Sequence, residues 1–410
     1  MFELTSILKS GKNQDNHNDQ IKTVLFYQTK QCKSLFEESF RFEGITVPIA
    51  IENKDDNIIE HVKNKSAEII IIELNKSKNL VADAERISHL IPTESAVVIV
   101  GAEDAMSTMR GLKKLGFYYL FWPATKSELV EFVNSIYDER ERPFSVSKGR
   151  KAKRISIVGA KGGVGTTMVT AELSCLLAET RHSSSIIVDH NYNSGNLDIM
   201  LGINKFEKKK VQKGALSDNL DVSSSRSLLV KKSNLLSILS ISAEEFSYGE
   251  MVDYRRSIIN VMRSECNFIV EDISASTGQV FDFNNDWMES DCIVVITNAT
   301  VSSLRDAGRL NSIIEAMPTT ERPRVFIVVN HTMPEKYASV SSDEIEKFLK
   351  RKVDLVIPYI KDFSDVILDG KRLAARRHRS AMVLNQLSSL VLGEDINAKK
   401  SFFKKIVSKG

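Results

Sequence analysis

Val158-Gly-Ala-Lys-Gly-Gly-Val-Gly-Thr-Thr167 decides the fold, because it joins the apolar run Arg154–Val158 to the amphipathic segment Met168–Glu179. A strand that ends in glycines lets successive backbone N–H groups turn inward around an anion. The following helix adds the positive partial charge of its N-terminus, and Thr167 offers a hydroxyl to Mg²⁺. The sequence therefore predicts a phosphate-binding loop between a strand and a helix.

This loop departs from the common phosphate-loop pattern GxxxxGK[ST] at two positions. Ala160 stands at the first glycine, and Thr166 stands at the lysine. An uncharged threonine cannot neutralise phosphate oxygens as an ammonium group does. A different lysine, Lys161, stands at the head of the loop.

The arrangement Lys161-Gly-Gly-Val-Gly165 resembles the deviant Walker A motif of the ParA/MinD family. The resemblance implies a dimer that sandwiches ATP and Mg²⁺, in which Lys161 reaches across the interface to the nucleotide of the partner chain. It also implies that the loop contacts the nucleotide through Gly162, Gly163, Val164, Gly165, Thr166 and Thr167.

A second strand and its switch region resemble the same family. Ile186-Ile-Val-Asp189, followed by Gly195-Asn-Leu-Asp198, implies that Asp189 acts near the magnesium together with Thr167. Asn191 stands where the family places the aspartate that positions the attacking water. An amide can orient water, but it cannot take up a proton as a carboxylate does.

Three further segments complete the resemblance. Asn267–Asp272 resembles Walker B and implies that Asp272 is a metal-shell carboxylate, although a carboxylate that merely ends a strand is the alternative. Asn330 matches the asparagine that reads adenine, and Pro358 lies in the segment that closes over the base. Because Thr166 and Asn191 are both altered, we expect nucleotide binding with slow hydrolysis or none.

Two α/β domains are predicted from the alternation of apolar strands with helical segments. Residues 21–138 contain the strand candidates Thr23–Tyr27, Glu68–Glu73, Ala96–Val100 and Gly116–Trp122, and a helix over Ser127–Tyr137. Residues 154–392 contain Arg154–Val158, Ser185–Asp189, Leu235–Ile241, Phe268–Asp272, Cys292–Thr297 and Arg324–Asn330. Unbroken apolar strands of this kind predict parallel sheets covered on both faces.

The first domain resembles a response-regulator receiver, a flavodoxin-like fold, but lacks its phosphorylation residues. Tyr27-Gln28-Thr29 stands where the receiver family has an acidic pair, and Trp122 replaces the lysine before a proline. Glu73 stands at the phospho-acceptor position, where we expect only a strand-end carboxylate. Trp122 is either a protein contact or half-buried packing.

The segments outside the two domains are polar or basic. Residues 1–20 are predicted to be a loose arm and residues 139–153 a linker, either a solvated hinge or a nucleic-acid or lipid contact. The tail over residues 393–410 is either a frayed basic end or an interfacial amphipathic helix that resembles the membrane-targeting helix of MinD, with an apolar face formed by Phe402, Phe403, Ile406 and Val407.

The bulk composition is that of an ordinary globular protein. The 410 residues carry a net charge of +3, with 42% hydrophobic and 27% charged residues. Four cysteines without a CxxC pair indicate free thiols in a reducing compartment. Without a secretory signal or an apolar run of ~20 residues, we expect a cytoplasmic protein, whether polar or peripheral to the inner membrane.

The pairing of the two domains resembles the CpaE/TadZ proteins of type IV (Flp/Tad) pilus assembly, and Ser302–Ala307 matches a segment of that family. It implies a dimeric localisation factor that recruits pilus components, including the secretion ATPase. One alternative is a partition ATPase that grips DNA through Lys148–Arg154 and Arg376–Arg379, although Thr166 and Asn191 weigh against the turnover it needs. A phosphorylation-driven regulator is opposed by the missing acidic pair.

Overall fold

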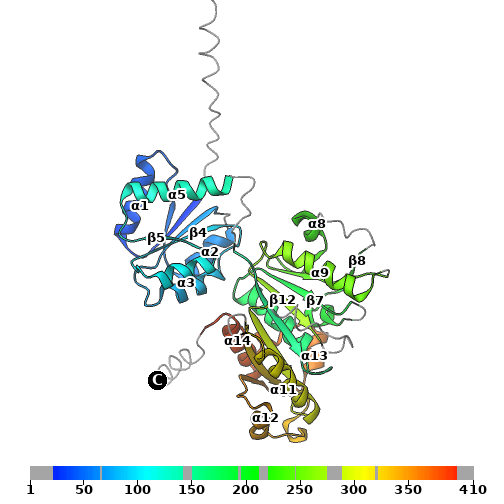
Figure 1. The fold of residues 1–410 in the computed structure, drawn as a ribbon. Helices are drawn as coiled ribbons and strands as arrows, with labels where there is room; N and C mark the ends of the chain where they lie inside the picture. Colours follow the sequence, from blue (N-terminus) through cyan, green and yellow to red (C-terminus); the bar gives the residue numbers. More distant parts are fainter. Residues whose placement is uncertain are drawn as a thin grey trace, which may run out of the picture. The chain divides into compact units, whose positions relative to one another are not determined.

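The computed structural model describes residues 22–64, 67–141, 150–192, 195–211, 220–244, 246–274, 289–318 and 322–394. The predicted arm, most of the predicted linker and the apolar face at Phe402, Phe403, Ile406 and Val407 lie outside these residues. The chain divides into two compact units, one made of Met1–Ala84 with Ser95–Lys148 and the other of Glu85–Glu94 with Gly149–Gly410. Each unit is described by itself (Figure 1).

The first unit contains a five-stranded parallel sheet in the order β2-β1-β3-β4-β5, which confirms the flavodoxin-like fold. Its buried core includes Phe36 and Phe40 of α1 packed with Leu129 and Val133 of α5. The elements are β1 Thr23–Tyr27, α1 Lys30–Phe42, β2 Ile49–Glu52, α2 Asp55–Asn64, β3 Ile69–Glu73, α3 Leu80–Ser88, of which Leu80–Ala84 belongs to this unit, β4 Ala96–Gly101, α4 Met106–Lys114, β5 Tyr118–Phe121 and α5 Lys126–Glu141.

The second unit contains an eight-stranded sheet in the order β15-β14-β13-β6-β12-β7-β10-β9. Its pairs are parallel except for β9 with β10. The strands are β6 Lys153–Gly159, β7 Ser185–Asp189, β9 Leu229–Lys231, β10 Leu236–Leu239, β12 Phe268–Ile273, β13 Cys292–Thr297, β14 Arg324–Asn330 and β15 Leu355–Ile357. The predicted strand Leu235–Ile241 is wrong in its extent, since β11 Ile241–Ser242 pairs with β8 Lys209–Lys210 in a separate sheet.

Helices cover both faces of this sheet, as predicted. Alternate residues of β6, β13 and β14 pack on one face against α6 Thr166–Cys175 and α14 Arg379–Val391, and on the other against α11 Val301–Glu315 and α12 Ser342–Leu349. The predicted helix Met168–Glu179 changes into a π-helical turn at Leu176–Thr180. The remaining helices are α7 Leu197–Leu201, α8 Val222–Ser227, α9 Tyr248–Met262 and α13 Phe363–Leu368, with short 3₁₀ turns at Glu335–Tyr337 and Leu373–Ala375.

The predicted linker is ordered at both of its ends. Helix α5 continues to Glu141, and β6 already begins at Lys153. Within the second unit, the buried Arg150 donates hydrogen bonds to the carbonyls of Ser88 and Ile91, at 3.0 and 3.1 Å. A linker therefore stays a prediction for residues 142–149 alone, which lie outside the described ranges.

Candidate nucleotide-binding site

The phosphate loop leaves β6 at Gly159 and enters α6 at Thr166, as predicted. Gly165 has a φ of +91°, a left-handed conformation that favours glycine. A Cβ atom on Gly165 would lie 2.3 Å from the Nδ2 atom of Asn330. The glycine is therefore required by both the backbone conformation and the close approach of the neighbouring strand.

Asn330 ties the end of β14 to this loop. Its buried side-chain amide donates a hydrogen bond of 2.8 Å to the carbonyl oxygen of Val164. A residue predicted to read adenine thus also fixes the backbone of the phosphate loop. The two segments are 166 residues apart in the chain. The shape of the site is therefore set by this tertiary contact and not by local turn geometry.

A cavity of about 520 Å³ lies against the loop and Asn330. Of the predicted nucleotide contacts, five line it: Gly163, Gly165, Thr166, Thr167 and Asn330. Other lining residues are Met168, Asn196, Met200, Ser274, His331, Thr332, Tyr359, Ile360, Lys361, Phe363 and Ser364. Pro358 directly precedes the lining segment, and Lys161 and Gly162 are exposed at the head of the loop. The loop thus forms one wall, and the segments after β14 and β15 form another.

Asp189 and Asp272 lie side by side at the carboxyl ends of β7 and β12. Asp272 accepts a hydrogen bond of 3.4 Å from the hydroxyl of Thr170. Burial raises the pKa of Asp272 to about 7, the negative charge of Asp189 adds to the rise, and hydrogen bonds from Thr167 and Thr170 oppose it. A cation would favour the ionised carboxylate. Of the three predicted metal-shell residues, Thr167 lines the cavity and Asp189 and Asp272 do not, so the metal site stays a prediction.

Asp189 already has partners on both oxygens. Its Oδ1 accepts from the backbone N–H of Asn191 at 2.9 Å. Its Oδ2 accepts from the hydroxyl of Ser240 at 2.9 Å and from the ammonium of Lys208 at 3.2 Å. Neither Ser240 nor Lys208 was predicted, because nothing in their local sequence distinguishes them from neighbouring serines and lysines.

Residues 155–373 match the protein-family model described as CobQ/CobB/MinD/ParA nucleotide binding domain, which covers more than half of the chain. The chain belongs to this family. Among its relatives, the septum site-determining protein MinD of Helicobacter pylori is 27% identical over 265 residues, covering 61% of this chain and 96% of that protein. MinD of Thermotoga maritima is 26% identical over 222 residues, covering 52% and 77%.

Similar solved structures include a ParA family ATPase from Chlorobium tepidum, with a TM-score of 0.48 and 22% identity, covering 58% of this chain and 98% of that one. MinD of Pyrococcus horikoshii, solved in complex with Mg-ADP, has a TM-score of 0.45 and 18% identity, covering 58% and 96%. The fold is the MinD/ParA type of phosphate-loop α/β domain, preceded here by the flavodoxin-like unit.

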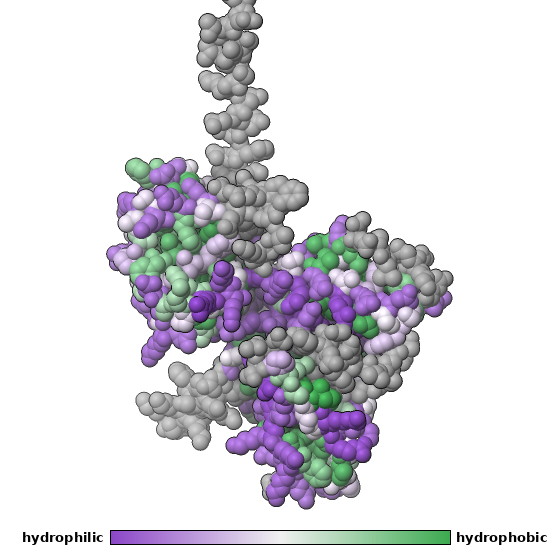
Figure 2. All heavy atoms as spheres, viewed as in Figure 1, coloured by the Kyte–Doolittle hydropathy of each residue, from purple (hydrophilic) through white to green (hydrophobic). Residues whose placement is uncertain are grey.

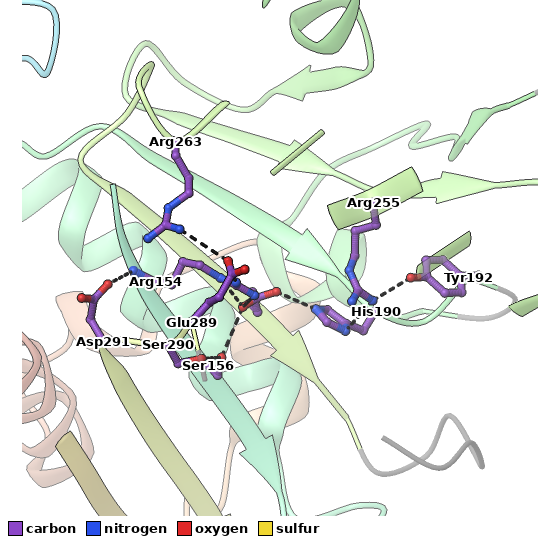
Figure 3. Close-up of polar contacts among 10 residues, drawn as sticks. Arg154, Ser156, His190, Tyr192, Arg255, Arg263, Glu289, Ser290 and Asp291 are labelled. Carbon is purple, nitrogen blue, oxygen red and sulfur yellow. Dashed lines mark hydrogen bonds and ion pairs between the residues drawn. The ribbon is translucent and has the colours of Figure 1, made fainter. Parts of the chain in front are cut away.

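Behind the carboxylates, this MinD/ParA-type domain contains a buried polar network (Figure 3). Glu271 precedes Asp272 on β12, and consecutive strand residues face opposite sides of a sheet. One oxygen of Glu271 accepts from Nη2 of Arg154 at 2.8 Å and from its Nε at 3.1 Å. The other oxygen lies 3.1 Å from Nε2 of His190, the residue after Asp189. Asp189 and Asp272 are therefore each adjacent in sequence to a residue of the network, His190 and Glu271 respectively.

The network continues from His190 to the loop that carries Asn191. Arg255 of α9, which is fully buried, places its Nη1 atom 2.9 Å from Nδ1 of His190 and 2.7 Å from the hydroxyl of Tyr192. A guanidinium can only donate, so Nδ1 of His190 is the acceptor and its Nε2–H donates to Glu271.

Glu271 is ionised despite its complete burial. Burial alone would raise its pKa, but the charge of Arg154 and the hydrogen bond from His190 hold the pKa of Glu271 well below its usual range. Arg154 has a second carboxylate partner, Glu289, at 2.8 Å, and its backbone N–H donates to Asp291. The buried charges of Arg154 and Glu271 are therefore paired with each other.

In the first unit, Glu73 is the last residue of β3, where the sequence predicts a strand-end carboxylate, and both of its side-chain oxygens accept hydrogen bonds. Its carboxylate accepts from the backbone N–H groups of Gln28 at 2.6 Å and Thr29 at 2.8 Å. It also accepts from the hydroxyl of Thr29 at 2.7 Å and the side-chain amide of Asn75 at 2.8 Å. Trp122 is half-buried and packs against the core of this unit, which favours the packing alternative.

Proposed function

We propose that the chain is a localisation and recruitment factor for the assembly of Flp/Tad-type pili, which binds ATP as a dimer and hydrolyses it slowly or not at all. The observation that carries the nucleotide part is the cavity between the phosphate loop and Asn330. The pilus part rests on the pairing of this domain with a flavodoxin-like unit that resembles a receiver without its phosphorylation residues.

Mg²⁺ and ATP are the proposed ligands of the cavity and of the two carboxylates beside Thr167. Thr167, Asp189 and Asp272 would hold the metal, and the glycine loop would cradle the phosphates. When bound, the metal neutralises negative charge on the phosphate oxygens. Lys161 is exposed at the head of the loop, in keeping with a role toward the nucleotide of a second chain.

Slow hydrolysis follows from two side chains. Thr166 is buried against the cavity, where the ordinary motif has a lysine, and it carries no charge. Among the described lining residues the one lysine is Lys361, on the opposite wall from the loop. Asn191 offers an amide where the family has a carboxylate, so proton uptake from an attacking water has no base there.

A recruiting role suits the surface of the first unit. Its acceptor position is closed by four hydrogen bonds to Glu73, so phosphorylation has no free carboxylate to use. Apolar side chains are exposed on α4 and β5, including Met106 at 70% and Phe121 at 44%. Green patches among polar surface are visible on this unit (Figure 2). Such side chains suit binding of another pilus-assembly protein, for example the secretion ATPase.

For the DNA-partition alternative, three arginines of the basic segments are engaged within the protein, while Lys151, Arg377 and Arg379 are exposed. Arg154 is committed to the buried network, and Arg150 donates to backbone carbonyls. Arg376 forms an ion pair of 2.6 Å with Asp362. These arginines therefore use their donors within the protein rather than presenting them to phosphates.

Nucleotide binding and turnover test the first part of the proposal. We expect the purified chain to bind ATP and to release phosphate at a rate near background. Thr166→Lys should raise the rate of phosphate release by ~10-fold or more, because it restores a cation at the phosphates. Lys161→Ala should retain ATP binding but lower the dimer fraction seen by light scattering. Unchanged phosphate release in Thr166→Lys would mean that Thr166 is not the limiting defect.

Imaging of a functional fluorescent fusion at native expression tests the second part. We expect a stable focus, usually at a pole and independent of the nucleoid, that is lost when pilus-assembly partners are deleted. A signal spread over the nucleoid would favour DNA partition instead.

Membrane contact through Phe402, Phe403, Ile406 and Val407 is part of the proposal. It predicts that anionic vesicles sediment the ATP-loaded chain, but not a chain truncated at residue 393. None of the helices in the described ranges is both long and apolar enough to cross a bilayer.

A further inference from the structure

Three consecutive lysines, 208 to 210, have different environments although their chemistry is identical. Lys209 and Lys210 form the exposed strand β8, and Lys210 only reaches Glu244 at the surface, at 3.4 Å. Lys208 turns inward, and 17% of its side chain is exposed. Its ammonium donates to Oδ2 of Asp189 at 3.2 Å and also to the carbonyl oxygen of Asn191.

This contact makes Lys208 the counter-ion of a carboxylate in the nucleotide site. The side chain of Asp189 is 2% exposed, so the pair is shielded from water and its attraction is much stronger than that of a surface ion pair. The other partners of Asp189, Ser240 and the N–H of Asn191, are neutral donors. Among the described hydrogen-bond partners of Asp189, Lys208 alone supplies a positive charge.

The position of this charge matters because the site is otherwise short of cations. Asp189 lies beside Asp272 at the ends of neighbouring strands, and Asp272 accepts a hydrogen bond from Thr167, which lines the cavity. The loop position that ordinarily supplies a lysine is Thr166. Without a metal, bare carboxylates would repel a nucleoside triphosphate, and Lys208 cancels the charge of one of them.

We propose that Lys208 is a built-in counter-ion of Asp189 that allows the site to hold a nucleoside triphosphate with little dependence on Mg²⁺. This inference rests on the proposed nucleotide binding. It assigns Lys208 a positioning and charge-balancing role. The same contact joins the segment before β8 to the loop at Asn191, so removal of the ammonium also frees that loop.

The test compares Lys208→Met with Lys209→Met in the full chain. Both variants remove one lysine charge, but Lys209 is exposed and has no contact with Asp189 among the described interactions. The dissociation constant of a methylanthraniloyl-labelled ATP is measured with excess Mg²⁺ and with EDTA. We expect the EDTA-to-Mg²⁺ ratio to be below about 5 for the wild type and for Lys209→Met, and about tenfold larger for Lys208→Met.

A second variant separates charge balance from folding. Lys208→Arg, which keeps the charge, should also have a low ratio. Circular dichroism confirms that each variant is folded.

Three results would overturn the inference. They are equal ratios in Lys208→Met and Lys209→Met, a large ratio in the wild type itself, or a large ratio in Lys208→Arg. Failure of the wild type to bind the labelled ATP under either condition would instead overturn the proposed nucleotide binding, and the role of Lys208 with it.

Discussion

Glu73 and Asp272 occupy equivalent places in two different sheets. Each is a buried carboxylate at the carboxyl end of a parallel strand, β3 in the first unit and β12 in the second. Glu73 accepts four hydrogen bonds, two of them from backbone N–H groups. Asp272 receives hydroxyl hydrogen bonds from Thr167 and Thr170, and its pKa is raised to about 7.

The difference shows that a carboxylate at the carboxyl end of a parallel strand does not form a binding site by its position alone. Glu73 has its charge satisfied by donors of its own unit, so nothing is left for a metal or a phosphoryl group to satisfy. Asp272 is buried next to another carboxylate and is short of positive charge. The number and kind of donors around a carboxylate decides whether it is a structural or a binding group.

Replacement of Glu73, whose carboxylate accepts four hydrogen bonds, should have the largest effect on the free energy of unfolding. Glu73→Leu leaves the partly buried N–H groups of Gln28 and Thr29 without this acceptor. We expect the first unit to lose about 3–5 kcal/mol in free energy of unfolding. Urea unfolding followed by Trp122 fluorescence, in a Trp287→Phe background, measures the change.

Glu52→Leu is the matched control, because Glu52 also ends a strand of the same sheet but pairs with Lys54 at the exposed surface. It should change the free energy of unfolding by less than about 1 kcal/mol. If both variants unfold at the same urea concentration, Glu73 does not hold the first unit together and the contrast with Asp272 disappears.

Asp272→Asn should change the free energy of unfolding less than Glu73→Leu does. It should stabilise the protein rather than destabilise it, by an amount that depends on pH. The folded pKa, about 7, lies above the ordinary 3.8, so the unfolded chain releases this proton first. The wild type therefore loses stability relative to the variant as pH rises from about 4 to about 7, and the difference is constant above that range. We expect the variant to be more stable by roughly 2 kcal/mol at pH 8 without metal.

Thermal unfolding at pH 4 and pH 8 measures this difference, with the exposed Asp369→Asn as control. Addition of Mg²⁺ and ATP should stabilise the wild type more than Asp272→Asn, because only the wild type offers this carboxylate to the metal. A variant that is equally stable at both pH values, relative to the wild type, would contradict the view that Asp272 is short of positive charge.

The phosphate loop and its strands could be predicted because their signals are local. Five of the strands in the second unit are mainly apolar runs of five to seven residues, and the glycines at 163 and 165 mark the turn. Strands β2 and β15 were not predicted as strands, because they are short, lie at sheet edges and include exposed residues, so they lack an unbroken apolar run.

The charge arrangement of the site could not be predicted from the sequence, because its partners are far apart in the chain. Lys208 lies 19 residues from Asp189, and Arg154 lies 117 residues from Glu271. Arg255 is 65 residues from His190 and resembles any polar residue of an amphipathic helix. Residue type identifies such groups as charged, but only the folded sheet shows which charges are paired.

The smallest predicted effect concerns the hydrogen bond between Tyr192 and Arg255, which supports the loop after Asp189. Tyr192→Phe removes the hydroxyl that accepts from Arg255 at 2.7 Å and keeps the ring that lies 5.8 Å from that of Tyr248. We expect the second unit to lose about 1 kcal/mol in free energy of unfolding, the usual net contribution of one hydrogen bond. Tyr337→Phe, at an exposed position, is the control and should cost nothing measurable.

The Tyr192 variant also distinguishes the two regions by how they are held. Glu73 is held by donors on its own oxygens, whereas the loop after Asp189 is held from behind, through Tyr192, Arg255, His190 and Glu271. If this support matters, amide hydrogen exchange in the loop at Asn191 should be faster in Tyr192→Phe, while exchange around Gln28 and Thr29 stays unchanged. Unchanged exchange at Asn191 would mean that Asp189 and Lys208 are sufficient to hold the loop, since they contact it directly.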